Sequence, residues 1–324
     1  MIWLTWRQHR RQALFTLVAL GILAAIMVPT GLAMHHDYVR SGLASCQDEV
    51  GTARMIRWSE SVVHCQQLRQ QFQQQYDSLA FVAILFVILP VFAGLFFGAP
   101  LVAREVEQGT HRLVWTQGVS RRRWALAKFG LVGAAAVLLA TVYALGMTWW
   151  FAPLSHAVGR LDYLIFDAQG IVPIGYTLFA VALGIFSGTL WRKVLPAMGV
   201  ALAGFAGVRL AVEVLARRHY MTPKTIAFSF DSALQPNPSA GDWLLAQGVR
   251  NAAGQLVAPN SKIGPCGPGG CGPHVPGIGP GAYNWQLYQP GSRFWLFQSI
   301  ETGIFVVLTV LLIYLAVRRL NRIA

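Results

Sequence analysis

The hydrophobic residues of this chain gather in six long runs that polar segments separate. Each run is close to the ~20 apolar residues that a helix needs to cross the hydrocarbon core of a bilayer. The pattern therefore predicts six membrane-spanning helices, over residues 13–34, 79–101, 125–150, 171–190, 194–215 and 296–317. The first run is too long for a cleaved signal peptide and is expected to be retained. Only three residues, Trp191 to Lys193, separate the fourth run from the fifth, so these two should form a tight hairpin.

The two longest polar segments are residues 35–78 and 216–295. In the first, Leu68, Phe72 and Tyr76 recur at helical spacing, which predicts an amphipathic helix over residues 66–80 that runs into the second span. The second is rich in Gly and Pro and has short apolar runs around TIAFSF and DWLLAQGV, so it should be a small, loop-rich domain with a strand or two. The predicted division is 1–12, 13–215, 216–295 and 296–324.

Composition agrees with this pattern. The chain of 324 residues has 55% hydrophobic and only 12% charged residues, whereas about a quarter of the residues in a soluble domain are charged. The expected fold class is an all-α polytopic membrane protein with six transmembrane helices and a loop-rich extracellular domain between the fifth and sixth spans.

The distribution of Lys and Arg predicts the orientation. With the amino terminus in the cytoplasm, the cytoplasmic segments hold 14 of the 26 basic residues and only two of the 13 acidic ones. Short cytoplasmic loops carry such an excess, so both termini are expected on the cytoplasmic side of the membrane. Topology and attraction to anionic lipid then explain the net charge of +13, and no nucleic-acid partner is expected.

The same orientation puts all four cysteines, Cys46, Cys65, Cys266 and Cys271, on the oxidising side, where disulfides persist. Chain proximity favours Cys46 with Cys65 and Cys266 with Cys271 among the three connectivities. A zinc site is the alternative, but the spacing does not suit it. The tripeptide His35-His36-Asp37 is a second candidate for a metal ligand set, but it is more typical of a polar cluster at the membrane surface. No metal site is predicted.

Few charges fall within the spans. Asp77, Glu213 and Glu301 lie near predicted outer ends, and Arg209 with Glu213 is an i, i+4 pair that could neutralise itself. No span carries an acid at mid-bilayer, which argues against a carrier driven by an ion gradient.

Motifs of catalysis are missing as well. The chain has no H-E-x-x-H, no G-x-S-x-G and no phosphate-binding G-x-x-x-x-G-K-[ST]. No catalytic residue and no cofactor are therefore predicted for this chain, and any energy for work is expected to come from another polypeptide.

The segment over residues 102–124 is longer than the 2 to 8 residues that suffice to join packed helices. Gly109 can break the preceding helix, and Thr110 can cap a short new one, HRLVWTQ, that exposes Leu113 and Trp115. Apolar groups rimmed by Glu105, Glu107 and an arginine run suit docking to another protein. The alternative is a basic linker that only fixes topology.

REVEQGT (residues 104–110) followed by SRRRWALAK (residues 120–128) resembles the loop between the second and third spans of type 2 ABC exporter permeases. The count of six spans and the long outer loop before the last one resemble that family over the whole chain. Three segments are similar to actinobacterial members in particular: MIWLTWRQHRRQ, RHYMTP (218–223) and YQPGSRFWLFQSIE (288–301).

The resemblance implies two functional elements near the cytoplasmic surface. One is a coupling helix that docks to a separate ATPase subunit, with Arg104, Glu105, Glu107, Gly109, Thr110, Leu113 and Trp115. The other is an amphipathic helix along the membrane surface over residues 1–12, with Trp3, Trp6, Arg7, Arg10 and Arg11. The residues alone also support this second element, because the tryptophans and the arginines fall on different sides of a helix.

The resemblance further implies a permease subunit that exports a drug, lipid or peptide with a second permease, identical or related. Two ATPase subunits would bind ATP and Mg. Gly94 with Gly98, and Gly184 with Gly188, have the GxxxG spacing that permits close helix approach. The alternative function is a non-transporting membrane sensor or assembly protein with an extracellular ligand-binding domain.

Overall fold

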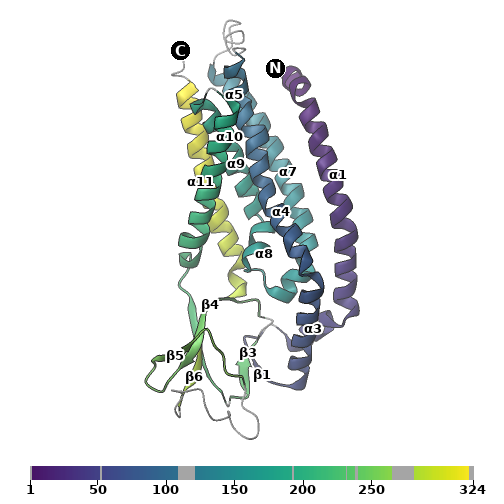
Figure 1. Ribbon diagram of the computed structural model, residues 1–324, viewed down its shortest axis with the longest axis vertical. Helices are drawn as coiled ribbons and strands as arrows, with labels where there is room; N and C mark the ends of the chain where they lie inside the picture. Colours follow the sequence, from purple (N-terminus) through teal and green to yellow (C-terminus); the bar gives the residue numbers. More distant parts are fainter. Residues whose placement is uncertain are drawn as a thin grey trace.

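A computed structural model describes residues 2–51, 53–108, 121–191, 193–230, 232–237, 240–264 and 281–320. Within them, six helices are long and apolar enough to cross a membrane, which confirms the predicted number (Figure 1). These candidate spans are Val18–Arg40, Val87–Glu107, Arg123–Val158, Val172–Leu190, Val194–His219 and Gly291–Leu320. Most of them differ from the predicted runs by several residues at an end, because the helices continue past the apolar stretch.

Several of the spans belong to longer or composite helices. Three are simple: α1 (Ile2–Arg40), α7 (Arg121–Val158) and α9 (Val172–Leu190). The second consists of α4 (Ser78–Ala93), the π-helix η1 (Gly94–Gly98) and α5 (Ala99–Glu107). The fifth consists of α10 (Val194–Ala211), the π-helix η2 (Val212–Ala216) and the 3₁₀-helix η3 (Arg217–His219), and the sixth is η4 (Gly291–Arg293) with α11 (Phe294–Leu320). Shorter helices are α2 (Leu43–Val50), α3 (Glu60–Tyr76) and α8 (Tyr163–Ala168).

Helix α9 forms the centre of the bundle, with 78% of its span buried. It contacts α11, α10, α7 and all three parts of the second span. Glycines make the closest of these approaches: a Cβ on Gly184 would lie 2.7 Å from the backbone nitrogen of Ala99, and one on Gly188 would lie 2.6 Å from its oxygen. Gly94 and Gly98 face α9 from the other side of the same crossing. The two GxxxG pairs therefore pack on each other within one chain, as their spacing permits.

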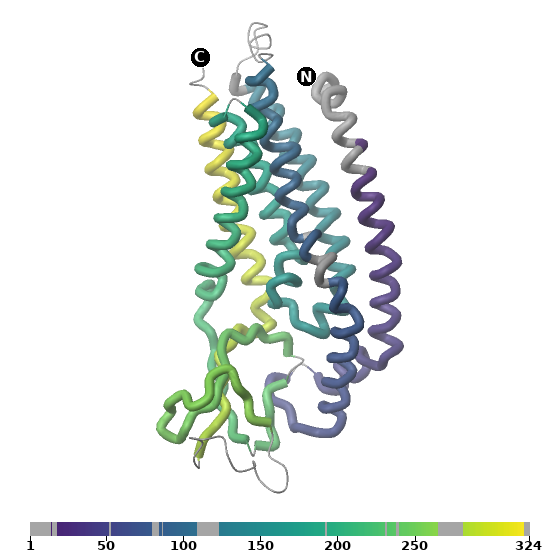
Figure 2. The backbone as a smooth tube through the Cα atoms, viewed as in Figure 1, coloured from purple at the N-terminus to yellow at the C-terminus, as the bar shows by residue number. Residues whose placement is uncertain are grey.

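The described side chains of α1 pack on the bundle mainly in its carboxy-terminal half, which the predicted orientation makes the outer half. Met27 and Met34 are buried against α7 residues such as Met147 and Trp150, and the indole nitrogen of Trp150 donates to Thr30 Oγ1 at 3.0 Å. Before this region, Val18 and Ile22 are more than half exposed. Figure 2 shows α1 as a long purple helix along one side of the molecule.

Six strands of the described chain lie at the end of the molecule opposite to the start of α1 and the end of α11 (Figure 1). A four-stranded antiparallel sheet has the order β2-β6-β4-β5, and a two-stranded one pairs β1 with β3. The bounds are β1 Met55–Arg57, β2 Lys224–Ser229, β3 Leu234–Pro236, β4 Trp243–Arg250, β5 Leu256–Pro259 and β6 Tyr283–Gln289. The all-α class is therefore wrong in this part, although TIAFSF and DWLLAQGV do form strands.

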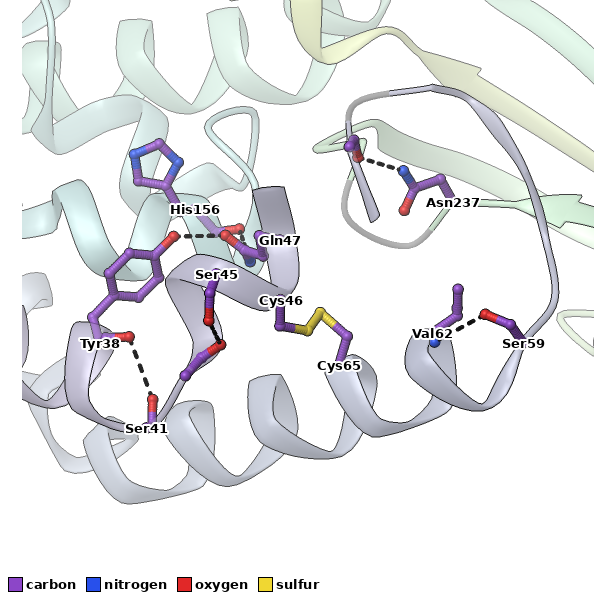
Figure 3. The surroundings of a disulfide bond; sticks show 12 residues. Tyr38, Ser41, Ser45, Cys46, Gln47, Ser59, Val62, Cys65, His156 and Asn237 are labelled. Carbon is purple, nitrogen blue, oxygen red and sulfur yellow. Dashed lines mark hydrogen bonds between the residues drawn. A yellow bond between two sulfur atoms is a disulfide. The ribbon is translucent and has the colours of Figure 1, made fainter. Parts of the chain in front are cut away.

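The two polar segments predicted to lie outside, residues 35–78 and 216–295, are joined to each other, which the predicted division did not include. Strand β1 of the first pairs with β3 of the second, with Ile56 opposite Gln235. The side-chain amide of Asn237, labelled in Figure 3, lies beside the first segment. It donates to the carbonyls of Gly51 and Ala53 at 2.9 and 2.8 Å. The two loops therefore form one structure at this end of the bundle.

The predicted amphipathic helix is confirmed as α3, although it begins earlier and ends at Tyr76. Leu68, Phe72 and Tyr76 all pack into the cluster that buries the outer half of α1. A disulfide joins Cys46 of α2 to Cys65 of α3, with a Cα–Cα distance of 5.7 Å (Figure 3). Two further cysteines, Cys266 and Cys271, lie outside the described residues.

Candidate functional site

The predicted coupling region begins at the end of α5, where Glu105 pairs with Lys128 of α7. Both side chains are largely buried, with 17% and 12% of their surface exposed. Ion pairs with little solvent around them hold their partners more firmly than exposed pairs do. Glu105 therefore links the second span to the third, and its partner is the lysine of the SRRRWALAK segment.

Glu107, the last residue of α5, makes a second link. Its Oε2 accepts a hydrogen bond from the backbone N–H of Val194 at 3.2 Å. Val194 is the first residue of α10, so the carboxylate satisfies one of the amide groups that a helix start leaves unpaired. Arg104 is exposed and lines a hollow of about 500 Å³ between the end of the second span and α10. Helix α5 is thus tied to both α7 and α10.

Four residues predicted for the coupling helix, Gly109, Thr110, Leu113 and Trp115, lie outside the described residues. The short docking helix itself therefore stays a prediction.

The predicted surface helix over residues 1–12 is not a separate element. Residues 2–40 form one continuous helix of 39 residues, which is about 58 Å long at 1.5 Å per residue. That length is roughly twice the hydrocarbon core. The side chains of Trp3, Trp6, Arg7, Arg10 and Arg11 lie outside what the structure describes. Their place at the membrane surface stays a prediction.

The His35-His36-Asp37 group makes contacts typical of a polar cluster at a helix end. His35 Nε2 lies 3.0 Å from the carbonyl of Trp149 and stacks on its ring, while Asp37 accepts hydrogen bonds from Tyr76 and Gln75 at 2.7 and 2.9 Å. Among the described residues, no group of three or more His, Cys, Asp or Glu side chains could hold a metal ion.

A cavity of about 490 Å³ lies between α1 and the rest of the bundle. Its walls come from α1 with Leu20, from the second span with Phe92 and Phe96, from α7 with Tyr143, and from α9 with Thr177. Phe92 and Phe96 are about half exposed, so the cavity opens at the side of the bundle. Its volume is in the range of small-molecule sites. None of the described residues that line it is charged.

A buried network of charges lies at the other end of the bundle, close to the sheets. Arg217 of η3 donates to Asp167 of α8 at 2.6 Å and to Glu301 of α11 at 2.7 and 2.9 Å. Arg209 of α10 donates to the second oxygen of Asp167 at 2.6 Å. The hydroxyl of Tyr176 on α9 lies within hydrogen-bond distance of both carboxylates, 3.0 Å from Asp167 and 2.5 Å from Glu301, and can donate its one proton to either. Two arginines and two acids thus compensate each other among four helices.

Neighbouring groups complete this network. The hydroxyl of Tyr220 donates to Glu301 at 3.1 Å. Burial raises the pKa of Tyr220, and the Glu301 carboxylate raises it further, so the hydroxyl remains a donor. Gln298, one turn before Glu301, accepts from the N–H groups of Ile171 and Val172 at 2.9 Å and thereby caps the start of α9.

The sequence predicts only part of this network. It places Glu301 near an outer end in reach of water, but Glu301 is 1% exposed. It also suggests a pair of Arg209 with Glu213, whereas the ion pair of Arg209 in the described chain is with Asp167. Asp167 and Arg217 are not predicted as members. The only local signal is that Arg217 and Arg209 are spaced to share one helix face.

A family model described as "ABC-2 membrane transporter related" matches residues 17–217, well over half of the chain. The chain belongs to this family of ABC-2 type permeases. An ABC-2 permease is the membrane component of its transporter; it is generally not catalytic itself and in general works with a separate ATPase subunit. Comparisons with curated proteins and with solved structures find no match.

The sites of this ABC-2 permease differ in whether they fall within the matched residues 17–217. All residues that line the apolar cavity, and the Glu105–Lys128 and Glu107–Val194 links, lie within the matched part. The charge network straddles its boundary, because Glu301 and Gln298 lie in α11, beyond residue 217. The sheets of the second outer segment also follow the matched part.

Proposed function

We propose that this chain is the permease subunit of an ATP-driven exporter that moves an apolar or amphipathic compound, such as a drug, lipid or peptide, out of a bacterial cell. The observation that carries the proposal is the family match over residues 17–217, which spans the first five candidate membrane helices and the segment between α5 and α7. A second permease, identical or related, and two ATPase subunits that bind ATP and Mg would complete the transporter.

The arrangement of the chain supports an orientation with both termini in the cytoplasm. The start of α1, the end of α5 and the end of α11 lie together at one end, which also has the excess of Lys and Arg (Figure 1). The sheets and the Cys46–Cys65 disulfide lie at the opposite end. Positive loops stay in the cytoplasm, and disulfides persist outside it, so the two observations agree.

The links at the end of α5 suggest how movement would pass from the ATPase to the bundle. ATP binding would draw two ATPase subunits together and displace the segment over residues 109–120 of each permease. Because Glu105 ties α5 to α7 and Glu107 ties it to α10, these three helices would move together. Helix α1 packs mainly through its outer half, so the cavity between α1 and the second span would change its shape.

Copurification tests the partner. A tagged full-length chain, extracted from its native membrane in mild detergent, should bring down a polypeptide with a phosphate-binding loop, and the complex should hydrolyse ATP. Glu105→Ala and Gly109→Val should still reach the membrane but should lower that hydrolysis. Glu49→Ala, an exposed acid of α2 at the opposite end, is the matched control.

Unchanged hydrolysis in both variants would leave residues 102–124 as a linker that fixes topology. If no ATPase copurified, the exporter proposal would fail and a sensor or assembly role would take its place.

A further inference from the structure

The described lining of the apolar cavity contains no charged side chain that could pair with a charged group of a ligand. Its described lining contains two side-chain hydroxyls, of Tyr143 and Thr177, and Thr177 Oγ1 already donates to the carbonyl of Pro173 at 2.8 Å. A charged group placed here would lose its hydration without compensation. The cavity therefore suits the hydrocarbon part of a ligand.

The open side of this cavity lies among exposed apolar side chains of candidate membrane spans. Phe92 and Phe96 line it from the second span and are 41% and 52% exposed, and on α1 the neighbouring Ile22 is 59% exposed. These side chains belong to candidate membrane spans. A chain that already lies in the bilayer could thus enter from the side, without crossing water.

A second hollow adjoins the cavity and supplies a positive charge. Phe96 lines both of them, and the second hollow, of about 500 Å³, also has Arg104 in its wall. Arg104 follows Phe96 by eight residues along η1 and α5, which is about 12 Å along the helix axis. Arg104 is exposed and, within the described chain, takes part in no ion pair. Glu107 lines the same hollow and keeps its negative charge, but its carboxylate lies at the start of α10, where it accepts from the N–H of Val194 and the helix dipole favours an acid.

We propose that the cavity and the adjoining hollow form one binding site for an anionic amphiphile with a long hydrocarbon chain. The chain fills the cavity between α1 and the second span, and the anionic headgroup lies at Arg104. This site would define the substrate class of the exporter, and in that respect it rests on the proposed function. Binding of the ligand itself requires no ATPase.

The test uses the purified full-length chain in nanodiscs of zwitterionic phosphatidylcholine. The probe is a long-chain fatty acid with a diazirine near the chain end and an alkyne for detection; its methyl ester is the uncharged counterpart. After illumination, labelled peptides are mapped by mass spectrometry. We expect labels from the acid to concentrate in the peptides that contain residues 89–97 and 139–143, and an excess of unlabelled fatty acid to remove them.

Two matched variants of α1 test the cavity. Ala19 lines it and is exposed, so Ala19→Trp should fill it without disturbing a buried core. Ile22 is exposed on the same helix but does not line the cavity, so Ile22→Trp is the control. We expect Ala19→Trp to lose most of the labelling at residues 89–97 and Ile22→Trp to keep it.

Arg104→Gln tests the headgroup. It should reduce labelling by the acid about two- to fivefold, the range for loss of an exposed ion pair, and leave labelling by the methyl ester unchanged. Three results would overturn the proposal: labels spread evenly over lipid-facing peptides, equal labelling in the two Trp variants, or disulfide-linked dimers through Ala19→Cys, which would mean that a second copy covers this face. If labelling is as expected but no ATPase copurifies, the exporter proposal is refuted and the proposal of the binding site stands.

Discussion

The charge network near the sheets should make Glu301→Gln one of the most destabilising isosteric changes in the chain. The substitution keeps the size of the side chain and removes one of two carboxylates that face Arg217 and Arg209. Glu301 is 1% exposed and accepts two bonds from Arg217, at 2.7 and 2.9 Å. Removing one partner of a buried pair costs about 3 to 5 kcal/mol, because the other charge stays buried without compensation.

That cost is a large part of the 5 to 15 kcal/mol that typically separates folded from unfolded protein. Thermal unfolding in detergent micelles, followed by tryptophan emission, should show a midpoint roughly 5 to 15 °C lower. Ser299→Ala is the matched control on the same helix, since this exposed hydroxyl bonds only to the carbonyl of Trp295 in the described structure. It should change the midpoint little.

A double variant distinguishes the loss of the Arg217–Glu301 ion pair from a general loss of packing in the core. Arg217→Gln with Glu301→Gln removes both charges, so it should destabilise the protein less than the two single variants added together. Additive losses would refute the pairing argument, and so would a Glu301→Gln midpoint equal to that of Ser299→Ala.

Other features give predictions that are simpler to test. Gly184→Leu should greatly reduce the yield of monodisperse protein in size-exclusion chromatography, because a Cβ there would lie 2.7 Å from a backbone nitrogen of α5, whereas Gly199→Leu has open space and should be tolerated. Lys128→Met should lower the free energy of unfolding in denaturant by about 1.5 to 3 kcal/mol, the range for a hydrogen bond to a charged group; no change would show that its contact with α5 is idle. In intact cells, a cysteine at Arg122 should resist a membrane-impermeant thiol reagent and one at Ser261 should react, and the reverse pattern would invert the topology.

Features that depend on local hydrophobicity were predicted well from the sequence. The six spans follow from runs that no soluble element of ordinary composition would contain. Leu68, Phe72 and Tyr76 predicted α3 because their spacing matches one helix face, and all three pack where that face predicts. The helix ends at Tyr76 because Asp77 forms a turn before α4. A hydrophobic pattern does not indicate such a break.

Features that depend on distant partners were not predicted. Asp167 lies in a short segment between two spans, and nothing near it in the sequence shows that arginines from α10 and η3 will meet it. Charges near the end of a span are usually interpreted as water-exposed, and nothing in the sequence around Glu301 indicates that its side chain is buried. The coupling role of Glu105 stays a prediction, and its partner Lys128, 23 positions away, emerged only from the packing of α5 on α7.

The pairing of β1 with β3 has a consequence for biosynthesis. Ile56 and Gln235 face each other but are about 180 positions apart, which at 5 to 20 residues per second separates their synthesis by roughly 9 to 36 s. Cys46 and Cys65 are only 19 positions apart, so α2 and α3 can be locked together long before β3 exists. During this interval β1 has an open strand edge that another nascent chain can occupy. The rate of translation between these segments therefore sets how long each copy is exposed to pairing with the wrong partner.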